Sequence, residues 1–286
     1  MRYSITTVAL PHLSLEEMVQ LASGLGYDGL ELRVRRNPPQ AAGQPYSFWG
    51  NHKLDLSPDN VVERAPAIRR LCADHGLSIP ALASNATALD LDDLRRLADG
   101  AALLGCPLVR IGAPRRYDGS TSYQAIYRET LEAFARALTV VQSSGVRGLL
   151  EIHGGTITVS AGLALRLVER FSPSAVGVVY DVQNMVTEGY EGLRLGLDVL
   201  GPYLAHVHVG GHGPEPGARD ADGTLRWSWR ARDLSDGLIE TPRLLGELRR
   251  VEYQGFITVE DFRPDLPAER KFGDALRYLR GLEAGA

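Results

Sequence analysis

The sequence is poor in cysteine, in long apolar runs and in excess positive charge, and each shortage argues against a class of protein. Its two cysteines, Cys72 and Cys106, do not form a CxxC pair, which argues against a disulfide framework or a thiolate metal site. No apolar run is long enough to cross a bilayer, and the start MRYSITTVAL lacks the apolar core of a signal peptide, so we expect a cytoplasmic protein without a membrane partner. The formal net charge of −4 argues against nucleic acid as a partner.

Segments rich in Val, Ile and Leu alternate with amphipathic helical patterns along the chain. We expect strands at residues 3–10, 29–34, 78–84, 108–112, 148–153, 176–181, 204–209 and 256–261. We expect helices at residues 14–23, 60–75, 90–104, 123–143, 161–171, 193–200, 242–251 and 268–282. Strand and helix units that alternate in this way over 286 residues predict an α/β protein, a single (β/α)8 TIM-barrel domain over residues 1–286. An open, doubly wound sheet is the alternative.

Two connections are longer than a tight turn between a strand and a helix, at residues 35–59 and 210–238. Each follows a predicted strand. In a barrel, both therefore lie over the mouth at the carboxyl ends of the strands, where active sites form. Long loops at that end are more often functional than accidental.

Four ionisable residues close successive apolar strands: Glu151 in GLLEIH, Asp181 in VGVVYD, His208 in LAHVHV and Glu260 in GFITVE. Burial of such groups is costly unless they pair with one another or share a cation. Three carboxylates and an imidazole suit one divalent metal ion, with Mn²⁺ first and Co²⁺, Mg²⁺ or Zn²⁺ as alternatives. Ordinary polarity at the mouth of a barrel is the competing interpretation.

The segment LAHVHVGGHG places three histidines within a few positions. His206 and His208 share one face of a strand, and His208 is nearer the mouth, so His208 is the predicted ligand. His206 is expected to support the ligand or to pack in the barrel, and His212 is expected in a loop. A lone histidine on a strand is more often a packing residue than a ligand, and that interpretation stays open for each.

Further residues are candidates for contact with a substrate. His153 shares a face with Glu151 and is a candidate catalytic residue, although it could equally cap the strand against the following glycine turn. The candidate substrate-binding residues are Glu31, Arg33, Arg110, Asn184, Trp49 and Trp229. Glu31 and Arg33 could instead satisfy each other, and tryptophans of the long loops, Trp227 included, could anchor those loops rather than stack on a ring.

With these residues in place, the chain resembles the xylose isomerase-like barrel superfamily. This sugar phosphate isomerase/epimerase group includes tagatose and psicose 3-epimerases, inosose dehydratases and endonuclease IV. The resemblance covers nearly the whole chain and is carried by GYDGLEL, LLEIH, YDVQN, HVHV and LSDGLIETPRLLGELRRVEYQGFITVED. It implies metal ligands at the same four positions: Glu151, Asp181, His208 and Glu260.

One position departs from the family pattern. Many members have a histidine three residues after the aspartate of strand six, and this chain has Asn184. Endonuclease IV relies on additional histidines for a cluster of three metal ions. Together with the negative net charge, Asn184 therefore argues against DNA repair and favours a single metal ion.

The resemblance also implies a reaction. In the similar epimerases, a metal ion holds adjacent oxygens of a ketose, and two carboxylates on opposite faces move a proton at the carbon between them. Glu151 and Glu260 match those positions, which implies that both are catalytic. Because a cation stabilises an enediolate and so acidifies the C–H beside a carbonyl, the expected activity is that of a divalent-metal-dependent isomerase or epimerase acting on a ketose or keto-polyol.

Two other functions remain as hypotheses. The first is a metal-dependent lyase, which dehydrates as inosose dehydratases do or cleaves a 3-keto glycoside as the similar C-glycoside deglycosidases do; His153 suits the acid or base of such an elimination. The second is a barrel that binds a sugar or a partner subunit without turnover, although four converging ionisable groups without a metal ion would be costly. The expected partner is a small-molecule sugar or keto-sugar, and a homo-oligomer or a partner subunit is left open.

Overall fold

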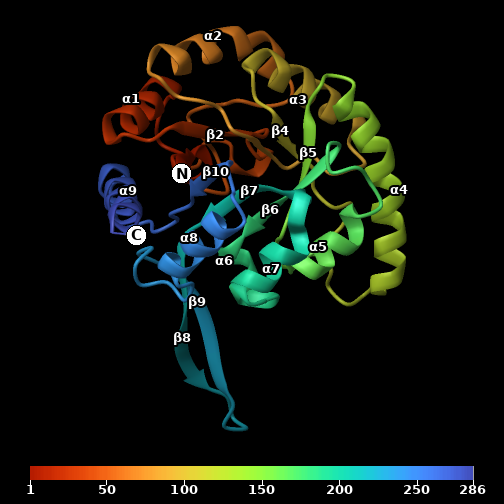
Figure 1. Cartoon of the computed structure of the whole chain (residues 1–286), viewed down its shortest axis with the longest axis vertical. Helices are drawn as coiled ribbons and strands as arrows, with labels where there is room; N and C mark the ends of the chain where they lie inside the picture. The colour runs from red at the N-terminus through yellow and green to blue at the C-terminus, as the bar shows by residue number, and fades with distance from the viewer. Residues whose placement is uncertain (286) are drawn as a thin grey trace.

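A closed parallel barrel forms the centre of the protein in the computed structural model, which describes residues 1–285 (Figure 1). Around the barrel the strand order is β1-β10-β7-β6-β5-β4-β3-β2. The bounds are β1 Arg2–Thr6, β2 Gly29–Val34, β3 Leu82–Ser84, β4 Leu108–Arg110, β5 Arg147–Glu151, β6 Val176–Asp181, β7 Leu204–Val209 and β10 Phe256–Val259. The predicted (β/α)8 barrel is confirmed, and the open sheet is wrong.

Helices surround the barrel on its outer side (Figure 1). Their bounds are α1 Leu15–Leu25, α2 Val61–Asp74, α3 Leu91–Leu104, α4 Tyr123–Gln142, α5 Ala161–Val168, α6 Val182–Glu188, α7 Leu193–Leu200, α8 Thr241–Arg250 and α9 Ala268–Ala284. Short 3-10 turns occur at η1 Thr7–Ala9, η2 Pro39–Ala41 and η3 Gly201–Tyr203. Local sequence sets the boundaries: a capping box between Ser14 and Glu17 starts α1, and Gly26 ends it with φ 89°. Of the described helices, none is both long and apolar enough to cross a membrane.

The structure adds a hairpin and a helix that the sequence patterns do not show. Within residues 210–238, expected to be a loop, β8 (Gly211–Arg219) and β9 (Leu225–Arg232) form an antiparallel hairpin that projects from the barrel (Figure 1). The sequence does not predict β8 because this strand contains glycine and proline, which are unfavourable in central strands. Each strand of an isolated hairpin has a free edge, where both residues are tolerated. The short helix α6 begins directly after β6.

The other long loop, residues 35–59, is fastened to the last part of the chain. The ring centroids of Phe48 and Trp49 lie 5.4 and 5.0 Å from that of Phe262, which follows β10. The Nζ of Lys271 lies 5.1 Å from the centroid of the Phe48 ring. These contacts hold the loop across the carboxyl ends of the strands, and the cavity described next lies at that end of the barrel.

Candidate active site

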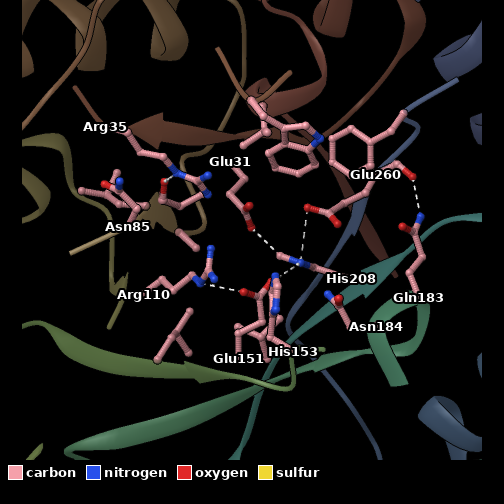
Figure 2. A pocket seen from close by; sticks show the side chains of 18 of the residues that line it. Glu31, Arg35, Asn85, Arg110, Glu151, His153, Gln183, Asn184, His208 and Glu260 are labelled. Carbon is pink, nitrogen blue, oxygen red and sulfur yellow. Dashed lines mark hydrogen bonds and ion pairs between the residues drawn. The ribbon is translucent and has the colours of Figure 1, made fainter. Parts of the chain in front are cut away.

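A cavity of about 540 Å³ opens at the carboxyl ends of the barrel strands, within the size range of small-molecule sites. Its lining residues come from strand ends and from the loops that follow them (Figure 2). Those with charged or imidazole side chains are Glu31, Arg35, Arg110, Arg116, Glu151, His153, His208, His212 and Glu260. The cavity therefore brings together ionisable side chains from parts of the chain that are distant in sequence.

The structure brings the four predicted metal ligands together around one atom. Nδ1 of His208 lies 3.3 Å from Oε1 of Glu151, 3.5 Å from Oε1 of Glu260 and 3.6 Å from Oδ2 of Asp181. Ligand atoms of Glu151, Asp181 and His208 lie within 4.8 Å of one another. The Asp181 side chain is fully buried, and that of Glu260 is 12% exposed. Glu151, Asp181 and His208 thus form a compact group of potential ligands, and Glu260 faces the same imidazole nitrogen.

A divalent cation fits this arrangement. Nδ1 of His208 is buried and has no hydrogen-bond partner within residues 1–285, although three carboxylates face it. The pKa shifts reveal the excess of negative charge: burial, and next to it the charges of Asp181 and Glu151, raise the pKa of Glu260 to about 8 against the opposing effect of His208. Burial opposes protonation of His208, yet Glu31 and Glu260 raise its pKa well above the ordinary value. A bound cation would relieve this repulsion.

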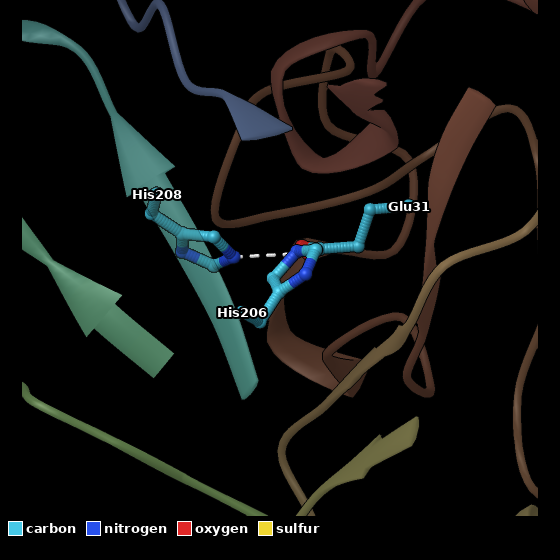
Figure 3. A group of neighbouring side chains, drawn as sticks. All are labelled: Glu31, His206 and His208. Carbon is cyan, nitrogen blue, oxygen red and sulfur yellow. Dashed lines mark hydrogen bonds and ion pairs between the residues drawn. The ribbon is translucent and has the colours of Figure 1, made fainter. Parts of the chain in front are cut away.

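Glu31 holds the imidazole of His208 from the opposite side (Figure 3). Its Oε2 accepts a hydrogen bond from Nε2 of His208 at 2.9 Å and another from Nε2 of His206 at 2.8 Å. Although burial opposes ionisation, the two imidazoles lower the pKa of Glu31. A carboxylate that fixes the ring of a ligand histidine is a common feature around metal sites, so His206, which also lies 2.8 Å from Oγ1 of Thr258, completes this support.

Glu31, His206 and His208 also form a second possible ligand group. It supplies only one carboxylate, and both Nε2 atoms already donate hydrogen bonds to that carboxylate. The group of Glu151, Asp181 and His208 is the better candidate for a metal site, because its imidazole nitrogen is unpartnered and its two carboxylates supply more negative charge.

The interpretation that Glu31 and Arg33 satisfy each other is not what the structure shows. Glu31 binds the two histidines, whereas the guanidinium of Arg33 donates to the carbonyl oxygens of Arg35 and Gly50. The two side chains have different partners because the strand ends at Val34 and the loop that follows brings its carbonyl oxygens to Arg33. Arg33 therefore supports the loop and lies outside the residues that line the cavity.

Neighbours orient two of the carboxylates. Nε of Arg110 lies 2.6 Å from Oε2 of Glu151, and although burial opposes it, Arg110 lowers the pKa of Glu151 to about 2. Asp181 caps α6: its Oδ1 accepts from the backbone N–H of Asn184 at 2.9 Å, and its Oδ2 accepts from Nδ2 of Asn184 at 2.5 Å. Asn184 thus lines the cavity while it fixes the Asp181 carboxylate.

The remaining candidates are divided between the cavity and the loops. His153 lines the cavity, and its Nδ1 donates to the carbonyl of Gly154 at 2.7 Å, so it both faces the cavity and contacts the glycine turn. Trp49 lines the cavity and also packs on Phe262. Trp229 lies outside the lining, with its ring centroid 5.5 Å from that of His212, which does line the cavity.

Sequence reasoning missed several lining residues: Arg35, Asn85, Arg116, Gln183, Thr187 and His212. Arg35 and Asn85 directly follow β2 and β3. The rule that found Glu151 and Asp181, a polar residue where an apolar strand ends, applies to both and would have found them.

A family model described as "Xylose isomerase-like TIM barrel" matches residues 19–282. The chain belongs to this family. No curated protein matches it. Solved structures with the same fold include the probable 3-DHS dehydratase AsbF from Bacillus anthracis, 18% identical over 98% of this chain and 99% of that one, with a TM-score of 0.72.

Epimerases share the fold as well. The 3-keto-D-glucoside 4-epimerase YcjR from E. coli is 16% identical over 98% of this chain and 99% of that one, with a TM-score of 0.69. A D-psicose 3-epimerase in the presence of D-fructose is 14% identical over 99% of each chain, with a TM-score of 0.71. At these identities the likeness concerns the fold, and the activity has to be argued from the site.

Proposed function

We propose that the protein is a divalent-metal-dependent isomerase or epimerase of a ketose or keto-polyol. The observation that carries the proposal is the convergence of three carboxylates on the unpartnered Nδ1 of His208, inside a cavity of about 540 Å³. Glu151, Asp181, His208 and Glu260 would hold the ion, with Mn²⁺ as the first choice. When bound, the ion supplies polarisation of a carbonyl, which acidifies the neighbouring C–H.

Proton transfer falls to Glu151 and Glu260. The two carboxylates come from different strand ends and flank the His208 imidazole, Glu260 above it and Glu151 below it in Figure 2. One carboxylate can take a proton from the substrate carbon, and the other can return a proton to the opposite face. Arg110 holds Oε2 of Glu151 and leaves Oε1 on the side of His208, so it orients the carboxylate for this task.

A metal-dependent lyase is the second candidate, and the position of His153 is the observation that favours it. Nδ1 of His153 is engaged with the carbonyl of Gly154, so Nε2 is the ring nitrogen that can exchange a proton with a group in the cavity. A leaving hydroxyl or glycosidic oxygen needs such a proton donor. The dehydratase and the epimerases that share the fold span both reactions.

Hydrogen exchange with solvent tests the proposal. The purified protein, loaded with Mn²⁺, is incubated in deuterium oxide with ketoses, inososes and 3-keto glycosides. Incorporation of deuterium beside the carbonyl, together with an epimerised product, supports the isomerase; loss of a β-substituent supports the lyase. Stoichiometric metal without exchange on any of these substrates would contradict both enzymatic proposals.

A further inference from the structure

The cavity contains three arginines, Arg35, Arg110 and Arg116, which we call the arginine wall. Arg35, Arg110 and Asn85 lie on one side of the cavity in Figure 2, and Gln183 and Asn184 lie on the other. Neighbouring guanidinium groups repel one another and are stable beside anions. Glu151 supplies an anion to Arg110, through an ion pair of 2.6 Å. The wall therefore carries more positive charge than this one ion pair balances.

Arg35 presents its terminal amino groups to the cavity. Its Nε donates to the carbonyl oxygen of Ala83 at 3.0 Å, which fixes the plane of the guanidinium. Within residues 1–285, no acceptor lies at hydrogen-bond distance and angle from the two terminal nitrogens. Burial, and next to it the charge of Arg110, lower the pKa of Arg35 to about 10, so the group stays charged at neutral pH. A charged, oriented and unused fork of donors faces the cavity.

The charged side chains around the cavity also favour an anionic ligand. Four carboxylates lie in or beside the cavity and face His208, and one of them, Glu151, is also paired with Arg110. Once a divalent ion is bound, the three guanidinium groups outweigh the carboxylate charge that remains. Neutral sugar hydroxyls do not need such a surplus, whereas carboxylate and phosphate groups match the forked donors of arginine.

We propose that the arginine wall binds a carboxylate or phosphate substituent of the substrate, so that the substrate class is an anionic keto-sugar. This inference rests on the proposed function, because the carbonyl end of the same molecule then lies beside Glu151, His208 and Glu260. The anionic group is held in place while the reacting carbon meets the carboxylates, which sets the orientation of the substrate.

Binding measurements on the Mn²⁺-loaded protein test the wall without turnover. The probes are inorganic phosphate, D-gluconate and the neutral D-glucitol, each titrated calorimetrically into the natural protein, Arg35→Gln, Arg35→Lys and Arg36→Gln. Arg36 is the matched control, because it is the next residue, carries the same charge and pairs with Asp59 and Asp93 at the surface.

We expect Arg35→Gln to weaken the anionic probe by about 10- to 100-fold and to leave D-glucitol unchanged. Arg35→Lys, which keeps the charge and loses the fork, should recover part of the affinity, and Arg36→Gln should stay within about twofold. An effect on gluconate alone identifies a carboxylate as the group that binds, and an effect on phosphate alone identifies a phosphate. Equal affinities of the natural protein and Arg35→Gln for both anions would overturn the inference.

The measurement separates this inference from the proposed function. If no substrate exchanged deuterium, the proposed enzymatic function would be wrong. The difference in anion affinity between the natural protein and Arg35→Gln would still be observed. If Arg35→Gln bound anions as well as the natural protein does, and neutral ketoses exchanged deuterium, the anion-binding inference would be wrong and the proposed isomerase function would stand. Metal content, measured for each variant, shows that the substitutions act on the wall and not on the ligands.

Discussion

Nε2 of His208 donates a hydrogen bond to Oε2 of Glu31 at 2.9 Å, and this bond turns Nδ1 of the same ring towards the strand-end carboxylates. An ionised carboxylate can only accept, so Nε2 carries a proton, and Nδ1 is the ring nitrogen whose lone pair can bind a metal ion. The tautomer of the predicted ligand is therefore set by a residue on β2, far away in the sequence.

Replacement of Glu31 should weaken metal binding although Glu31 is not a proposed ligand. Glu31→Gln removes the charge that fixes the tautomer of His208, and we expect the affinity for Mn²⁺ to fall by about 10- to 100-fold. Competition titration against a chelating dye measures the change. Arg33→Gln, on the same strand but directed to the loop, is the control. An unchanged affinity in Glu31→Gln would mean that His208 is oriented by other contacts.

Replacement of His208 should lower metal occupancy more than replacement of His206. In His208→Ala only oxygen ligands remain, and these form a weaker and less selective site. His206→Ala removes only a neighbour of Glu31, and we expect the smaller loss. Metal content after dialysis, measured by elemental analysis, compares the two variants. Full occupancy in His208→Ala would point to His206 as the ligand.

Replacement of either proposed proton carrier should separate catalysis from metal binding. Glu151→Gln and Glu260→Gln keep the shape of the side chain and lose the basic carboxylate, so exchange of the substrate hydrogen should fall by about 10²- to 10⁴-fold, far more than metal content. Glu169→Gln, at the exposed end of α5, is the control. If both variants kept full turnover, proton transfer would belong to His153 or to a bound water.

His153→Ala should distinguish the two candidate reactions. In an isomerase that uses two carboxylates, the variant loses substrate affinity or a modest part of its rate. In a lyase it loses elimination and keeps deuterium exchange at the acidic carbon, because the two steps use different groups. Product analysis beside the exchange assay resolves these outcomes. Equal loss of exchange and product would show that His153 acts before the reactions diverge.

His52 should make the fold sensitive to acid. It is buried, its Nε2 donates to the carbonyl of Phe48 at 3.1 Å, and burial, with Arg33 second, lowers its pKa to about 4. Between the unfolded pKa of about 6.5 and this value, the unfolded chain binds a proton that the folded chain does not, so stability falls as the pH falls through that window.

The variant His52→Gln keeps the donor and cannot be protonated. On lowering the pH from about 7 to about 4.5, it should lose about 2 kcal/mol less free energy of unfolding than the natural protein. Urea midpoints at a series of pH values measure the difference. Parallel curves for the two proteins would show that His52 is protonated as readily in the fold as in the unfolded chain.

The sequence predicted the barrel because apolar runs and helical patterns alternate, and that signal is local. The convergence of Glu151, Asp181, His208 and Glu260 followed from one geometric rule, that parallel strands end on the same side of the barrel. Their identity as ligands stays a prediction. So does the single domain over residues 1–286.

Other features depend on contacts between distant residues, which sequence patterns do not show. Periodicity assigns Glu31 to a face of a strand but cannot say that His206 and His208 lie across the barrel from it. The hairpin was missed because Pro214 and Pro216 contradict strand propensity, although they lie opposite Trp229 and Trp227 on the partner strand. Pairing with that strand decided the structure there.

The positions of the tryptophans allow ligand binding to be followed by intrinsic fluorescence. The sequence has three of them: Trp49 lines the cavity, Trp229 contacts His212 at the cavity, and Trp227 is 59% exposed on the hairpin. Indole fluorescence responds to the polarity around the ring, so we expect a molecule that occupies the cavity to change the emission of Trp49, which lines it. Ligands can therefore be screened by intrinsic fluorescence, without a label and before any reaction product is known.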